Sequence, residues 1–98
     1  MARFDVYELE GGGLVLDCQA DIFERIGTRF VVPLAREGDS APVTPRLHPR
    51  FDIGGEKLVM MTEFAAAIPT SALRSKIISL ESEQYRIIGA IDVLTGTG

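Results

Sequence analysis

One segment of this sequence has the apolar spacing of an amphipathic helix, and it lies at the C-terminal end, within Ser82–Leu94. Apolar side chains recur there at positions i, i+4 and i+7 and therefore share one helix face. These side chains are Ile87, Ile91 and Leu94. Gly96 follows and is expected to end the helix. The stripe is wide for so small a chain, so we expect Ile91 and Leu94 to meet their counterparts across a two-fold axis in a homodimer.

The N-terminal part of the chain has the pattern of a β-hairpin. Apolar and polar residues alternate through Arg3–Leu9, which favours a strand with two different faces. The triplet Gly11-Gly12-Gly13 follows, and glycine reaches the positive φ of tight turns at low cost. Leu14–Cys18 is then predicted to return as the second strand, with Cys18 buried as a structural thiol.

Two further segments predict strands. Thr28–Leu34 is apolar enough to be buried on both faces, and Pro33 requires a bulge, an edge or a strand end because it has no N–H. Arg50–Ile53 and Lys57–Thr62 flank a Gly-Gly-Glu turn and predict a second hairpin.

The remaining segments carry weaker patterns. Asp21–Gly27 is predicted to be a loop or turn, and Arg36–Pro49 the longest irregular connection. Phe64–Ile68 favours a helical turn that the following proline ends. Thr70–Leu80 is expected to contain a short edge strand. Strands first and one helix last indicate a β-barrel or α+β fold, and residues 1–98 are expected to form a single domain.

Composition narrows the class of protein. The hydrophobic share of 46% excludes a wholly disordered chain, and the net charge of −4 with scattered basic residues argues against direct nucleic-acid binding. One cysteine cannot form an internal disulfide. We find no signal-peptide pattern and no apolar run long enough to span a bilayer, so a cytoplasmic protein is expected.

No group of residues has the pattern of a metal or cofactor site or of a catalytic centre. His48 has no second histidine or cysteine at metal-ligand spacing. Arg46, His48 and Arg50 resemble the acid and phosphate-binding set of a ribonuclease, but solvated loop charges are the simpler interpretation. The acidic residues Asp17, Asp21 and Glu24 are expected to solvate a loop, with Asp21 capping the turn after it; we therefore predict no enzyme activity.

Short blocks spread in order over nearly the whole chain resemble the CcdB family of toxins. They are Arg3-Phe-Asp-Val-Tyr7, Asp17-Cys-Gln-Ala-Asp-Ile22, Arg29-Phe-Val-Val-Pro-Leu34, Pro45-Arg-Leu-His-Pro-Arg-Phe-Asp-Ile-Gly54, Met60-Met-Thr62, Ala67-Ile-Pro-Thr-Ser71 and Ala90-Ile-Asp92. The Val-Val-Pro-Leu and Met-Met-Thr blocks are the most specific of them.

The resemblance implies a mainly β fold, an SH3-like barrel of the CcdB/MazF type with a C-terminal α-helix, that forms a homodimer. It implies the toxin of a toxin–antitoxin module, which binds the DNA gyrase A subunit and traps the cleaved DNA complex. A CcdA-like antitoxin would neutralise it. Members of the family carry no catalytic residues of their own.

The resemblance also assigns site residues. Gyrase contact in the family uses a Trp-Gly-Ile tail, and the corresponding positions here are Gly96, Thr97 and Gly98. The antitoxin-contact positions correspond to Ile22, Phe23, Asp92 and Thr95. Because the tail differs, a second interpretation stays open, an attenuated or non-toxic homologue that binds only an antitoxin. A third is a ribonuclease of the MazF/Kid type, which shares the barrel.

Overall fold

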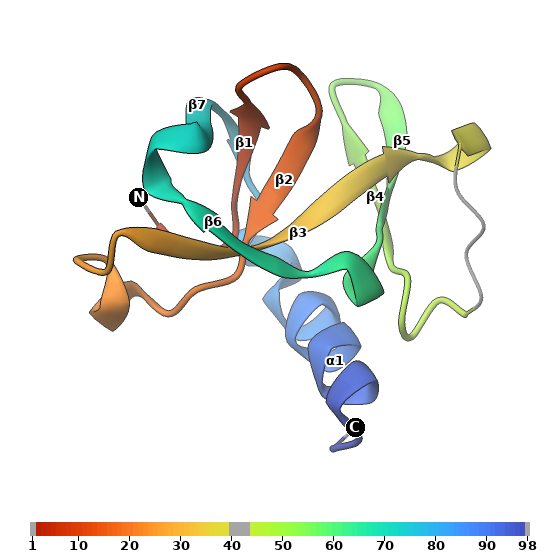
Figure 1. Cartoon of the computed structure of the whole chain (residues 1–98). Coiled ribbons are helices and arrows are strands. Elements are labelled where there is room, and N and C mark those ends of the chain that lie inside the picture. The colour runs from red at the N-terminus through yellow and green to blue at the C-terminus, as the bar shows by residue number, and fades with distance from the viewer. Residues whose placement is uncertain (1, 40–43, 98) are drawn as a thin grey trace.

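The computed structural model describes residues 2–39 and 44–97 of the chain. Its strands form an antiparallel sheet in the order β4-β5-β3-β2-β1-β7, with β6 paired to β3 outside this order. The sheet curls into a half-barrel, and helix α1 extends below it (Figure 1). The mainly β fold with a C-terminal helix is thus confirmed. The elements are β1 (Asp5–Leu9), β2 (Leu14–Asp17), β3 (Thr28–Arg36), β4 (Arg50–Ile53), β5 (Glu56–Met60), β6 (Ala66–Pro69), β7 (Leu73–Ser79) and α1 (Gln84–Thr95).

Both hairpins form where the sequence predicts them. β1 and β2 pair with Tyr7 opposite Val15, and the intervening Gly11–Gly13 all have positive φ. β4 and β5 pair with Phe51 opposite Leu58. The first strand begins at Asp5 and not at Arg3, because Phe4 has a φ of 73°, outside the range of an extended chain.

Strand β3 is shared between two parts of the sheet. On one edge it pairs with β2 along Val31–Leu34. On its other edge it pairs first with β6, from Thr28 to Val31, and then with β5, from Leu34 to Arg36. Pro33 lies at the change of partner, and its carbonyl accepts the Met61 N–H at 3.0 Å on that edge. The missing N–H of Pro33 therefore falls where the ladder is interrupted, which resolves the conflict expected between the proline and the strand.

The two faces of the sheet carry different cores. The larger core lies between the sheet and α1, where Ile87 and Ala90 are fully buried against Phe4, Val6 and Leu16 among others. The opposite face carries a smaller cluster around Tyr7, Val15, Val31 and Leu73. Successive residues of β1 therefore enter different clusters, Val6 the larger core and Tyr7 the smaller one.

Helix α1 ends as expected. Gly96 adopts a left-handed φ of 86°, and the Thr97 N–H donates to the Asp92 carbonyl at 2.8 Å, which closes the last turn. Glu81–Glu83 forms a 3₁₀ turn, η5, just before α1. None of the helices in the described ranges is long and apolar enough to cross a membrane.

Three local predictions differ from the structure. The predicted helical turn at Phe64–Ile68 is wrong, because Thr62–Phe64 forms the 3₁₀ turn η3 and Ala66–Pro69 is strand β6. β3 is buried on both faces only at Val31 and Val32, and its first half exposes one face. The edge strand β7 is confirmed but runs over seven residues. Residues 40–43 of the predicted irregular connection lie outside the described part of the chain.

Candidate protein-binding site

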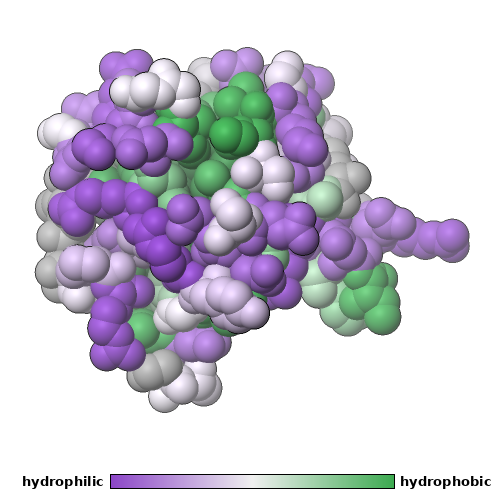
Figure 2. Space-filling view, turned by 180° about the vertical axis from the view of Figure 1, so that it is seen from behind, coloured by the Kyte–Doolittle hydropathy of each residue, from purple (hydrophilic) through white to green (hydrophobic). Residues whose placement is uncertain are grey.

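The loop between β2 and β3 exposes a group of large apolar side chains. Asp21–Phe23 forms one 3₁₀ turn, η1, in which no residue is buried. Ile22 is 83% exposed, Phe23 53% and Ile26 51%. We call these three residues the η1 patch. In the view from behind, apolar atoms protrude on the side of the molecule where this loop lies (Figure 2). Clustered exposed apolar side chains are typical of surfaces that bind another protein.

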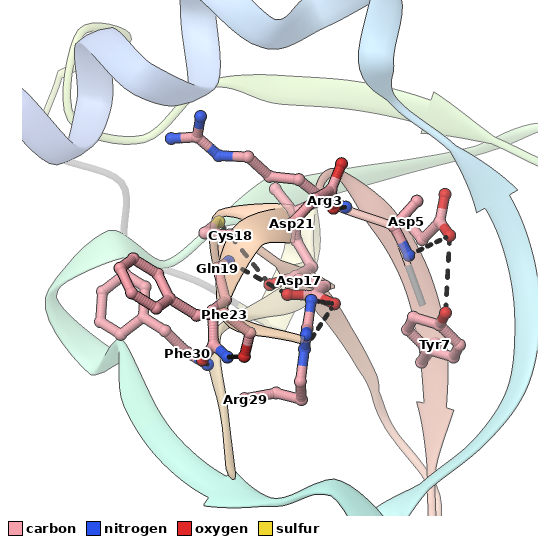
Figure 3. A network of polar contacts seen from close by, with 12 residues as sticks. Arg3, Asp5, Tyr7, Asp17, Cys18, Gln19, Asp21, Phe23, Arg29 and Phe30 are labelled. Atoms are coloured by element: carbon pink, nitrogen blue, oxygen red, sulfur yellow. Dashed lines mark hydrogen bonds and ion pairs between the residues drawn. The ribbon is translucent and has the colours of Figure 1, made fainter. Parts of the chain in front are cut away.

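The η1 loop is held by hydrogen bonds from its flanks. The Gln19 side chain donates through Nε2 to the Phe23 carbonyl at 2.9 Å, and its Oε1 accepts the Phe30 N–H at 2.9 Å. The Arg3 N–H donates to Asp21 Oδ1 at 2.7 Å (Figure 3). Asp21 therefore ties the loop to the N-terminal segment, and the expectation that it caps the following turn is wrong, since η1 has no side-chain cap.

Beneath the loop lies a buried ion pair. Arg29 donates to Asp17 Oδ2 from Nη2 at 2.6 Å and from Nε at 3.0 Å, and both side chains are fully buried. The other oxygen, Asp17 Oδ1, accepts the Gln19 N–H at 3.0 Å. Asp17 is thus a structural anchor, and its predicted role in solvating a loop is wrong. A period-2 pattern cannot reveal the partner, because Asp17 and Arg29 lie on different strands.

A second buried carboxylate lies on β1. Asp5 accepts the Tyr7 hydroxyl at 3.5 Å and pairs with Lys76 on β7 at 3.5 Å. Burial, followed by the negative charges of Asp5 and Asp17, raises the pKa of Tyr7. This arrangement keeps the phenol protonated, so it acts as a hydrogen-bond donor inside the half-barrel.

Cys18 cannot act as a nucleophile in this fold. Its side chain is buried, and desolvation together with the charge of Asp17 raises the pKa of the thiol to about 12. A catalytic cysteine requires a lowered pKa and access to substrate. The predicted structural role of Cys18 agrees with these observations.

The residues considered for a ribonuclease do not form an exposed catalytic set. His48 is fully buried and its Nε2 lies 2.7 Å from Glu63 Oε1, so the prediction of a solvated histidine is wrong. Burial of Glu63 opposes its ionisation, but the hydrogen bond to His48, a backbone hydrogen bond and the charge of His48 together outweigh this and lower the pKa of the carboxyl. Arg50 donates to Glu37 at 2.9 Å. A buried histidine cannot reach an RNA backbone from this position.

The end of α1 forms a separate surface. Leu94 is 45% exposed, whereas Ile91 is half-buried and packs against the larger core. Asp92 lines a shallow groove of about 340 Å³ between α1 and the segment that includes Pro45 and Arg46. The Thr95 hydroxyl donates to the Ile91 carbonyl at 3.0 Å, back onto its own helix.

The predicted antitoxin-contact residues therefore fall into two groups. Ile22 and Phe23 lie on the η1 loop, whereas Asp92 and Thr95 lie near the end of α1, and Figure 1 shows these segments apart on the same side of the sheet. Of the predicted gyrase-contact residues, Gly96 and Thr97 close the helix end, and Gly98 lies outside the described residues.

Sequence reasoning did not single out several exposed apolar side chains, including Ile26, Phe30, Phe64 and Tyr85. Ile26 completes the η1 patch, Phe30 lies on the open face of β3, and Tyr85 is 84% exposed at the start of α1. The exposure of Phe30 could have been predicted, because in a strand its side chain lies on the face opposite to Arg29 and Val31, and Val31 belongs to the smaller core. Nothing in the sequence indicated that Tyr85 would be exposed, since a single aromatic residue beside the apolar stripe of a helix is common.

No three His, Cys, Asp or Glu side chains among residues 2–39 and 44–97 come together in a way that could hold a metal ion.

The family model for the CcdB protein matches residues 3–97. The chain belongs to the CcdB family. Membership in the CcdB family supports the role of a toxin in a toxin–antitoxin system, which implies an antitoxin as partner.

Proposed function

We propose that this CcdB-family chain acts by binding proteins through exposed surfaces, with the DNA gyrase A subunit as its target and a CcdA-like antitoxin as its neutralising partner. The observation that carries the proposal is the η1 patch, where large apolar side chains remain exposed on a loop fixed by hydrogen bonds. The buried Cys18 and His48 argue against a catalytic alternative.

Antitoxin binding is assigned to the η1 patch together with Asp92 and Thr95. Apolar anchors at the centre of an interface usually dominate its binding energy. Phe23→Ser should therefore weaken binding of the purified CcdA-like antitoxin by at least about tenfold. Ile77→Ser is the matched control, because Ile77 on β7 is 46% exposed and lies far from η1 in sequence. Equal losses in both variants would remove the η1 patch from the interface.

Gyrase binding is tested by expression in a bacterial host. Growth arrest that a resistant gyrase A subunit relieves supports the target, as does retention of the A subunit in a pull-down. The same pull-down with residues 96–98 removed measures the contribution of the tail. Growth arrest that persists with the resistant subunit would point to another target.

A non-toxic antitoxin-binding homologue is the second candidate, and the tail favours it. The chain contains no tryptophan, and the Gly96 and Thr97 N–H groups are used to close the helix. Normal growth on expression combined with tight antitoxin binding would select this candidate over gyrase poisoning.

A homodimer through α1 is part of the proposal. Leu94 leaves apolar surface exposed near the end of the helix, and self-association would bury it. Ile91 packs against the core, so Ile91→Asp would destabilise the fold itself and is a poor test of assembly. Leu94→Asp changes an exposed residue and tests the dimer alone.

A further inference from the structure

The residues of the η1 turn, Asp21–Phe23, contribute little to holding their own backbone in place. A 3₁₀ turn of three residues, with no buried member and no side-chain cap, has little stability of its own. Its two apolar side chains are 83% exposed at Ile22 and 53% exposed at Phe23, and neither belongs to the buried core. Such a segment is normally mobile unless other groups fix its backbone.

The side-chain amide of Gln19 fixes the loop backbone through hydrogen bonds from both its nitrogen and its oxygen. Its Nε2 donates to the Phe23 carbonyl within the loop, and its Oε1 accepts the N–H of Phe30 on β3, each at 2.9 Å. The side chain thereby ties the exposed turn to a strand of the sheet. Both groups that it binds belong to the backbone, so the link fixes the path of the chain and leaves the Phe23 side chain free.

The buried ion pair fixes Gln19 in turn. The Gln19 N–H donates to Asp17 Oδ1, while Arg29 holds Asp17 Oδ2 from the neighbouring strand (Figure 3). Because Arg29 directly precedes Phe30, the ion pair sets both the residue that carries the amide and the strand segment that the amide binds. The chain of contacts runs without a gap from the buried sheet to the exposed turn.

We propose that Gln19 is a positioning residue that holds the η1 patch in the conformation that its protein partner recognises. A patch ordered in advance avoids the entropy that a mobile loop would lose on binding. The inference rests on the proposed function in one respect, namely that the η1 patch is the antitoxin-binding surface. Gln19 itself acts through the backbone of the loop and needs no contact with the partner.

Gln19→Met tests the proposal, because methionine has a similar length and lacks both hydrogen-bonding groups. Amide hydrogen exchange and ¹⁵N relaxation of residues 20–27 should show the loss of order, with order parameters falling from about 0.85 to below about 0.6. If one loop conformation in about ten then remains competent, the affinity for the purified CcdA-like antitoxin falls about tenfold. The fall should appear mainly in the association rate.

Two further variants separate positioning from general stability. Gln19→Glu keeps the acceptor for the Phe30 N–H and loses the donor to Phe23, so an intermediate loss of order and affinity is expected. Gln84→Met makes the same substitution at another half-buried glutamine, at the start of α1, and should leave the η1 loop and the association rate unchanged.

The outcomes distinguish this inference from the proposed function. Unchanged order in Gln19→Met, or lost order with unchanged affinity, would overturn the positioning role. If the unaltered protein fails to bind the antitoxin, the proposed function fails. A selective loss of order in the Gln19→Met loop would in that case still support the structural link from Gln19 to the η1 turn.

Discussion

Replacing Asp17 with asparagine tests the most deeply buried charge interaction in the protein. The two side chains are nearly the same size, and asparagine can still accept the Gln19 N–H through an oxygen. The substitution removes the negative charge that faces the fully buried Arg29 guanidinium at 2.6 Å and 3.0 Å. A buried charge left without its partner costs about 3–5 kcal/mol, and the hydrogen bonds that asparagine retains favour the lower end.

A loss of about 3 kcal/mol is large against a total stability of about 5–15 kcal/mol for a domain of this size. It corresponds to a fall in Tm of about 12–24 °C. Urea denaturation followed by circular dichroism measures the change directly. Protein concentration must be the same for all variants, since self-association would add to apparent stability.

Two companion variants define the result. Asp52→Asn is the control, because Asp52 pairs with Lys57 at 3.2 Å on the surface and should lose less than about 1 kcal/mol. The double variant Asp17→Leu/Arg29→Met should recover most of the loss, as apolar residues often replace a buried pair without cost. Arg29 Nη1 has no hydrogen-bond partner within the described residues, which adds to the cost of keeping the pair. A loss below about 1 kcal/mol in Asp17→Asn would refute the reasoning.

Four further results are expected. Cys18 should react with thiol reagents at pH 8 only when the protein unfolds, because the folded side chain is buried. Its folded pKa of about 12 lies above the ordinary value of 9.0, so the stability that it contributes is complete below pH 9 and declines as the pH rises toward 12. In urea denaturation measured over this pH range, Cys18→Ala should make that decline smaller. The lowered pKa of Glu63 stabilises the fold above about pH 4.5, and this stabilisation is lost as the pH falls through the folded value. Glu63→Gln should therefore reduce the rise of unfolding free energy with pH in the acidic range below about pH 4.5. Leu94→Asp should shift the light-scattering mass from dimer to monomer with little change in the circular dichroism spectrum. Gly96→Ala should cost about 1 kcal/mol in urea denaturation, because alanine disfavours the positive φ of the helix end.

Local patterns were sufficient to predict the hairpins and the helix. The period of two in the first strand, the glycine turns and the isoleucine stripe of α1 each act within a few residues, and the structure follows them. Strand β6 was missed because Ala65–Ala67 favours a helix by propensity, whereas pairing of Ala66–Pro69 with the first residues of β3 decides the conformation.

The polar core could not be predicted from the same patterns. Asp17 with Arg29, and His48 with Glu63, are partners across 12 and 15 residues, and nothing in their sequence neighbourhoods indicates that they meet. The exposed residues Ile22 and Phe23 were identified through the family resemblance. Their geometry, and the role of Gln19 in it, required the structure.

The change of partner at Pro33 has a consequence for how relatives of this protein can diverge. The β4–β5 hairpin joins the sheet only through the last residues of β3, so a longer or shorter connection before it leaves the segment around Arg29 in register. One extra residue between Phe30 and Val31 would instead turn Arg29 outward and Phe30 inward, if the register of Val31 is kept. Length variation should therefore accumulate in the connection before the β4–β5 hairpin and not in the first half of β3. Chimeras that exchange the β4–β5 hairpin between homologues should keep their choice of antitoxin.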